Sequence, residues 1–213
     1  MKKFIKAIKN YLPSILLMLL IVCTGITGAV YAKYITRAEK KIDLTVDAYG
    51  HTDVALCVSN NKANAWQDMS LNIVPGKTVG YNPYICVNAN NETGYIFIKV
   101  VENISGGLTF SNYVSYGVRG DTWTLLSQSG GEKIYWKYVT SGNTDRYFGI
   151  INGDQVTFPD TITEEKMTAL NSTSPTLAIS AYSCHSVNLS GNAGTPEQAA
   201  LAWAAIKTEY NIP

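Results

Sequence analysis

Apolar and polar residues alternate in several short segments, a pattern typical of half-buried strands. Apolar residues at every second position of 42–48 are separated by charged or polar ones, and residues 54–58 repeat the pattern. Residues 95–101 are apolar on both faces, which predicts a central strand covered on each side. A late strand is predicted at residues 176–187.

Turn residues separate these segments. Pro75-Gly76 predicts a type II turn, because proline fixes φ at the first central position and glycine accepts a positive φ at the second. Pro83 lacks a backbone donor and predicts an edge strand or a bulge. Gly130-Gly131, between the segments 123–126 and 134–139, predicts a hairpin.

Two helices interrupt the strand pattern. Thr161 with Glu164 predicts a capping box for a short helix that ends near Leu170, and Thr195-Pro196 predicts the start of a longer helix. One face of the longer helix is lined at helical spacing by Ala199, Ala202, Trp203, Ile206 and Tyr210. The sequence therefore predicts a mainly β fold, a jelly-roll-like antiparallel β-sandwich with two peripheral helices, preceded by an N-terminal signal helix.

The first 32 residues have the layout of a signal peptide. A basic start is followed by the apolar run 15–23 and then by small residues. Val30 and Ala32 stand at the −3 and −1 positions of a cleavage site before Lys33. This layout predicts a signal peptide at 1–32 and one exported domain at 33–213. The alternative is an uncleaved anchor, because residues 10–32 carry no charge, and it would be the chain's only membrane attachment.

Charge and cysteine content narrow the class of protein. Four of the 17 basic residues lie in the leader, so the 16 acidic residues outnumber the basic ones in the rest of the chain. This balance gives no electrostatic footprint for nucleic acid. Cys57, Cys86 and Cys184 follow the leader, and their odd number allows either one disulfide with one free thiol or no disulfide at all.

No catalytic, cofactor-binding or metal-binding constellation is visible. His51 and His185 are the only histidines, and neither lies in an H-E-x-x-H motif. Cys184 and His185 are adjacent in a predicted strand, so their side chains point to opposite faces. The acidic residues lack the spacing of a glycosidase pair or of a calcium loop; those considered are Asp145, Asp154, Asp160, Glu164 and Glu165. We therefore expect a protein that is not an enzyme and needs no cofactor.

Aromatic residues leave a second function open. The mature chain is rich in tyrosine and contains Trp66, Trp123, Trp136 and Trp203. Exposed rings would stack on sugars in a carbohydrate-binding or adhesive module, whereas buried rings would belong to a structural core.

Several short motifs occur in a defined order along the chain. The leader end 28–34 comes first, followed by Ile73-Val74-Pro75-Gly76-Lys77 and the strand residues 84–87 and 94–100. Aromatic and small residues come next: Trp123, Tyr135-Trp136, Gly142, Thr144, Ile179-Ser180-Ala181-Tyr182 and Ala202-Trp203. Together, in this order, these motifs resemble the TasA/camelysin-like family of secreted Firmicutes proteins, which are processed by the signal peptidase SipW.

This resemblance implies a central hairpin around Pro75-Gly76 and a jelly-roll subunit of extracellular biofilm-matrix fibres. In such fibres the N-terminal segment of one subunit, freed by a signal peptidase of the general or SipW type, inserts as a strand into the next. In this chain the donor strand would comprise Tyr34, Ile35, Thr36 and Ala38. Proteolytic activity is ascribed to camelysin-type members, so a divergent peptidase is a third alternative, after the fibre subunit and the carbohydrate-binding module.

Overall fold

The computed structural model describes residues 16–23, 41–50, 54–58, 61–65, 68–87, 93–140, 146–170, 174–185 and 193–212. The chain divides into two compact units, Met1–Glu39 and Lys40–Pro213. In the first unit, residues 16–23 are helical and exposed. Within the described ranges, no helix is both long and apolar enough to cross a bilayer.

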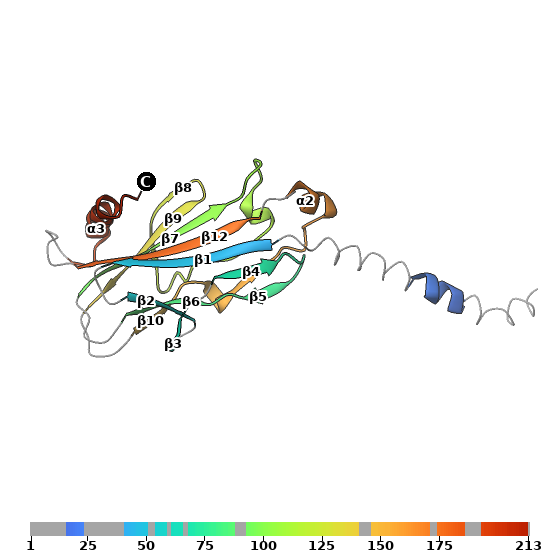
Figure 1. Ribbon diagram of the computed structural model, residues 1–213, viewed down its shortest axis with the longest axis horizontal. Helices are drawn as coiled ribbons and strands as arrows, with labels where there is room; N and C mark the ends of the chain where they lie inside the picture. The colour runs from blue at the N-terminus through green and yellow to red at the C-terminus, as the bar shows by residue number, and fades with distance from the viewer. Residues whose placement is uncertain are drawn as a thin grey trace, which may run out of the picture. The chain divides into compact units, whose positions relative to one another are not determined.

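A six-stranded sheet forms one layer of the second unit (Figure 1). Its strands, in spatial order, are β4 (Met69–Asn72), β1 (Lys41–Gly50), β12 (Thr176–His185), β7 (Gly94–Asn103), β9 (Glu132–Val139) and β8 (Thr124–Ser129). The strands predicted at residues 42–48 and 95–101 and the hairpin at Gly130-Gly131 are confirmed. The strand predicted at 176–187 is confirmed as far as His185, and its last two residues lie outside the described residues. The expectation of a purely antiparallel sheet is wrong, because β1 and β12 run parallel. Alternation fixes which face a residue occupies, not which strand lies beside it.

A smaller sheet lies beneath the first and makes the fold mainly β and sandwich-like (Figure 1). It contains, in order, β10 (Arg146–Gly149), β6 (Pro83–Val87), β2 (Val54–Val58) and β3 (Asn61–Ala65). A two-stranded ribbon of β11 (Gln155–Thr157) and β5 (Thr78–Gly80) accompanies the sheets, with short 3₁₀ helices η1 (Phe110–Asn112) and η2 (Asn152–Asp154).

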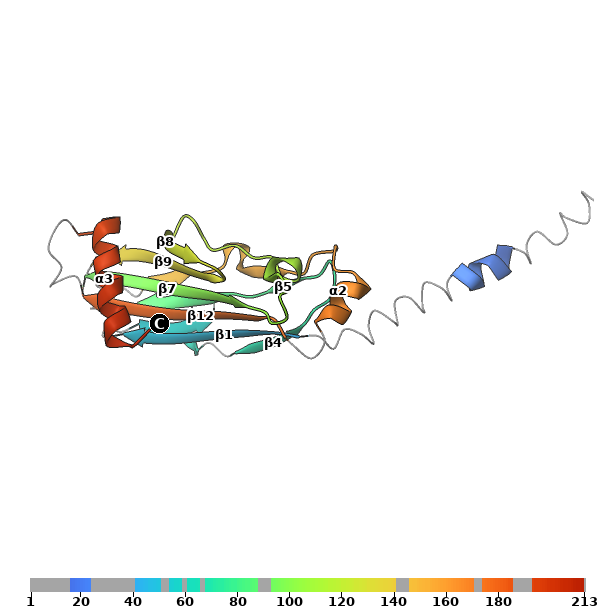
Figure 2. The same cartoon turned by 90° about the horizontal axis from the view of Figure 1, so that it is seen from above.

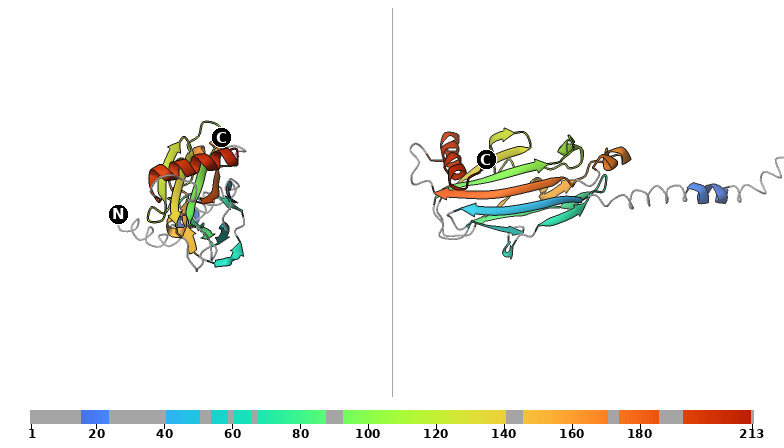
Figure 3. Two further views of the ribbon diagram at one scale, coloured as in Figure 1. Left: turned by 90° about the vertical axis from the view of Figure 1, so that its left-hand side faces the viewer. Right: turned by 45° about the horizontal axis from the view of Figure 1, so that its top comes forward.

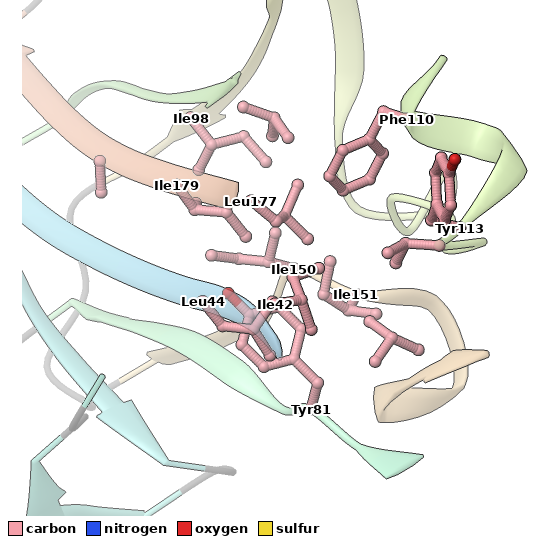
Figure 4. Close-up of a cluster of buried hydrophobic side chains, with 14 of the residues drawn as sticks. Ile42, Leu44, Tyr81, Ile98, Phe110, Tyr113, Ile150, Ile151, Leu177 and Ile179 are labelled. Carbon is pink, nitrogen blue, oxygen red and sulfur yellow. The ribbon is translucent and has the colours of Figure 1, made fainter. Parts of the chain in front are cut away.

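The main core fills the space between these layers (Figure 4). Alternate residues of β7 and β12 point into it, because successive side chains of a strand face opposite sides. Its most deeply buried members include Ile42, Leu44, Tyr81, Ile98, Ile150, Ile151, Leu177 and Ile179.

The turn at Pro75-Gly76 forms as predicted, but it does not close a hairpin. Gly76 has φ 74° and the Lys77 N–H donates to the Val74 carbonyl at 3.0 Å, as in a type II turn. The two flanking strands have other partners, since β4 pairs with β1 and β5 pairs with β11. The turn therefore carries the chain from one sheet to another.

The prediction that Pro83 marks an edge strand or a bulge is wrong. β6 lies between β10 and β2, and its register with β2 is continuous from Pro83 to Val87. Pro83 is the first residue of the strand, a position where the missing donor is tolerated. Its carbonyl accepts a hydrogen bond from the Ile150 N–H at 3.0 Å.

Both predicted helices form, with one correction. α2 (Glu164–Ala169) is capped by Thr163, whose hydroxyl accepts from the Lys166 N–H, and not by Thr161. Only Thr163 stands directly before the first helical residue, where a cap side chain reaches the free N–H groups. α3 (Pro196–Glu209) begins at Thr195 as predicted. It crosses the outer face of the six-stranded sheet at the end away from α2 (Figures 2 and 3).

Candidate functional site

The residues predicted to carry function at the N-terminus lie outside the described residues. These are the cleavage-site residues Val30, Ala32 and Lys33 and the donor-strand residues Tyr34, Ile35, Thr36 and Ala38. What the structure does describe is the strand that follows them. β1 begins at Lys41 and lies between β4 and β12, so the predicted donor segment precedes an interior strand.

The cysteines and histidines considered in the sequence do not form a described metal site. Across the described part of the chain, no group of three His, Cys, Asp or Glu side chains could hold a metal ion. Cys86 is buried in β6, while the half-buried Cys184 of β12 is a free thiol. Burial raises the pKa of Cys184 to about 11, so its thiol is mostly protonated at neutral pH. The side chains of His51, Cys57 and His185 lie outside the described residues.

The acidic candidates have separate places in the structure. Asp145 lies outside the described residues, Asp160 is exposed after the last strand of the ribbon, and Glu164 and Glu165 form the first turn of α2. Carboxylates in a first helical turn favour the helix through its dipole. Asp154 alone belongs to a partly buried polar cluster.

That cluster is centred on Arg119. The guanidinium lies 2.7 Å from Asp154 Oδ1, and its Nε donates to the Ile151 carbonyl at 3.0 Å. The Tyr84 hydroxyl lies 3.2 Å from Asp154 Oδ2 and accepts from Arg119 at 3.3 Å. Side-chain hydrogen bonding to Asp154 raises the pKa of Arg119. The cluster joins segments distant in sequence, and the alternation pattern held no signal for it.

Residues next to this cluster contact the end of β10 and the chain just after it. The Arg119 N–H donates to the Ile150 carbonyl at 2.9 Å, and Trp123 Nε1 donates to the Gly149 carbonyl at 2.9 Å. Val118 also bridges to Ile151. The last residue of β10 and the two residues after it are therefore contacted by other parts of the same chain.

Most of the described aromatic residues belong to the two cores. Every tyrosine and tryptophan whose side chain the structure describes is buried or half-buried. Under α3, a second core contains Tyr95, Phe97, Trp136, Tyr182 and Trp203. The Tyr95 hydroxyl donates to Gln198 Oε1 at 3.0 Å and accepts from the Gly194 N–H at 2.7 Å, which fixes the start of α3 to the sheet. A coplanar exposed row of rings is absent from the described residues.

The two edges of the six-stranded sheet are open with respect to the described strands. β4 and β8 are the edge strands, and each pairs with a described strand on one side only. β8 is the longer, with the sequence Thr-Leu-Leu-Ser-Gln-Ser, which carries no charge and no proline. Leu125 in this strand is 49% exposed. A bulge between Leu125 and Ser127 interrupts its pairing with β9, whereas the ladder from Ser127 to Ser129 is regular. An edge strand without charge or proline is a template for pairing with another chain.

The whole chain matches no protein-family model, no curated protein and no solved structure.

Proposed function

We propose that the protein is a secreted structural subunit of extracellular fibres that assemble by strand donation. The observation that supports this proposal most directly is that, among the described strands, both edges of the six-stranded sheet lack a second partner. Open edges present rows of N–H and C=O groups, and pairing with an incoming strand satisfies them. The fold class proposed with this function is the jelly roll of the TasA/camelysin-like family that the sequence resembles.

The position of β1 supports this proposal. The core residues Ile42 and Leu44 near the start of β1 are fully buried, so this strand is anchored in the core close to its first residue. Residues 33–40 lie in sequence between the predicted cleavage site and this strand. A short segment with alternating side chains, released by cleavage, is suited to pair with a free edge.

The buried aromatic rings favour this proposal over a carbohydrate-binding module. A sugar platform needs exposed rings, and the described tyrosine and tryptophan side chains are packed against the sheets or under α3. The described residues also contain no group of three His, Cys, Asp or Glu side chains that could hold the metal ion of a metallopeptidase.

The test compares two purified proteins, one starting at Lys33 and one starting at Lys41. The longer protein should form fibres by negative-stain electron microscopy and sediment as polymer. The shorter protein should remain monomeric with an unchanged melting temperature, because it keeps all of β1. Equal polymerisation of both proteins, or none by the longer one, would contradict the proposal.

Cleavage is tested separately on the exported protein. Its intact mass should correspond to a chain that starts at Lys33, because Val30 and Ala32 occupy the −3 and −1 positions. A membrane-bound product that retains the first 32 residues would show that the leader is an anchor.

A further inference from the structure

We propose that β8 is the edge that receives the donated strand, and that the strand comes from residues 33–38 of a second copy. This inference rests on the proposed function and specifies its acceptor. Three observations support it: β8 has backbone groups that point away from β9, the other described edge strands are shorter or partly covered, and the segment before Lys41 is too short to reach β8 of its own subunit.

The backbone of β8 has hydrogen-bonding groups that its neighbour cannot satisfy. β8 pairs antiparallel with β9, and Ser129 and Glu132 face each other across the two-residue turn. Such a flanking pair is hydrogen-bonded, and pairs alternate along the ladder, so the N–H and C=O of Gln128 point away from β9. Leu126 of β8 packs against the core under α3, whereas the side chain of Leu125 remains half exposed and belongs to neither described core.

Other described edges are shorter or partly covered. The Arg119 and Trp123 contacts reach the last residue of β10 and the two residues that follow it, and Ser115 bridges to Thr157 of β11. β5 has three residues, β4 has four and β3 has five, whereas β8 has six, as many as the segment 33–38, with a bulge between Leu125 and Ser127.

Chain geometry requires the donor to be another copy. A strand added outside β8 lies five strand spacings from β1, which is about 24 Å at about 4.8 Å per spacing. Ala38 lies three residues before Lys41, and three Cα steps span at most about 11 Å. The segment therefore cannot reach the β8 edge of its own subunit, whereas a neighbouring subunit's edge can be brought to it.

Two substitutions block this edge without altering the β9 side, and both are made in the protein that starts at Lys33. Leu125→Lys places a charge on the edge at a side chain that is already 49% exposed. Gln128→Pro removes an outward N–H, a change that edge strands tolerate. The matched control is Leu201→Lys on α3, where the side chain is 52% exposed and lies on no strand edge. Asn72→Lys tests the β4 edge in the same way.

We expect both β8 variants to raise the concentration needed for fibre formation about tenfold or more, which corresponds to the loss of one or two good hydrogen bonds. Leu201→Lys and Asn72→Lys should polymerise like the unmodified protein. Melting curves establish that each variant is folded, and Leu125→Lys decides the question if Gln128→Pro does not fold.

The outcomes separate this inference from the proposed function. If the unmodified protein forms fibres, its Lys41 truncation does not, and folded Leu125→Lys polymerises normally, then strand donation stands and the choice of β8 is wrong. If Asn72→Lys were the only variant that loses fibres, the acceptor would be β4, and the assignment to β8 would again be wrong. Dimers of the Lys41 truncation that Leu125→Lys dissociates would show that β8 pairs with a second β8, which contradicts the donor assignment. Failure of the unmodified protein to polymerise would overturn both proposals.

Discussion

Replacing Tyr95 with phenylalanine tests how α3 is held on the sheet. The hydroxyl of this fully buried residue donates to Gln198 Oε1 at 3.0 Å and accepts from the Gly194 N–H at 2.7 Å. Tyr95→Phe removes both hydrogen bonds and leaves a carbonyl oxygen and an N–H group without this partner. Each net hydrogen bond is worth about 1 kcal/mol, so we expect a loss of about 2 kcal/mol in the free energy of unfolding.

For a body of this size, that loss corresponds to a decrease of about 4–8 °C in melting temperature. The measurement is thermal unfolding followed by circular dichroism at neutral pH. Tyr138→Phe is the matched control, because the Tyr138 ring lies 5.0 Å from the Tyr95 ring and its hydroxyl makes no hydrogen bond within the described structure. Equal melting temperatures for Tyr95→Phe and Tyr138→Phe would refute the view that the hydroxyl anchors α3.

Three further predictions concern the turn, the thiol and the buried hydroxyls. Gly131→Ala should lower the free energy of unfolding, measured by denaturant titration, by about 2 kcal/mol, because a Cβ at this position would clash with the Glu102 carbonyl oxygen. The control is Gly120→Ala, where a Cβ meets open space and should have little effect. The Cys184 thiol should react slowly with a thiol reagent at pH 8, because its raised pKa of about 11 leaves only about one part in a thousand as thiolate. The reaction should become faster as the pH approaches this pKa. Modified sites are mapped by mass spectrometry, and immediate modification of Cys184 at pH 8 would contradict the prediction. Burial raises the pKa of several tyrosines above 10.0, so the stability that these hydroxyls contribute is fully present below pH 10 and should be lost as the pH rises further. The measurement is the melting temperature from pH 9 to about 12. A constant melting temperature over this range would contradict the prediction. The tyrosines concerned are Tyr81, Tyr95, Tyr113, Tyr116 and Tyr135.

The sequence predicted correctly those elements whose signals lie within a few neighbouring residues, such as helix caps and tight turns. Thr195 and Pro196 fix the start of α3 through a cap and a proline at the first turn, and both signals lie within four residues. Gly130-Gly131 predicted the hairpin for the same reason, because Gly130 takes a positive φ of 57° in the turn. Thr161 was wrong as a cap because two threonines stood close together, and only the exact helix start distinguishes them.

Long-range partners could not be predicted from the sequence in the same way. The parallel pairing of β1 with β12 joins residues more than 130 positions apart, and alternation is equally compatible with other neighbours. The Arg119, Tyr84 and Asp154 cluster depends on three separate segments meeting at the end of β10. The prediction for Pro83 was wrong because an interior strand tolerates proline at its first residue. Only the pairing of β6 with its neighbours shows that the strand begins at Pro83.

The place of β1 also determines where a fibre built in the proposed way would yield. A donated segment pulls on its own subunit through Lys41, along β1. This strand pairs with β12 from Asp43 to Gly50 and with β4 from Lys41 to Leu44, so a load along it acts on both ladders at once. Its side chains Ile42 and Leu44 are also fully buried in the core. The donated segment, by contrast, pairs on one side with the six residues of β8. Because the contact between subunits is the shorter ladder and lacks this core, such a fibre would separate into folded subunits before any subunit unfolded.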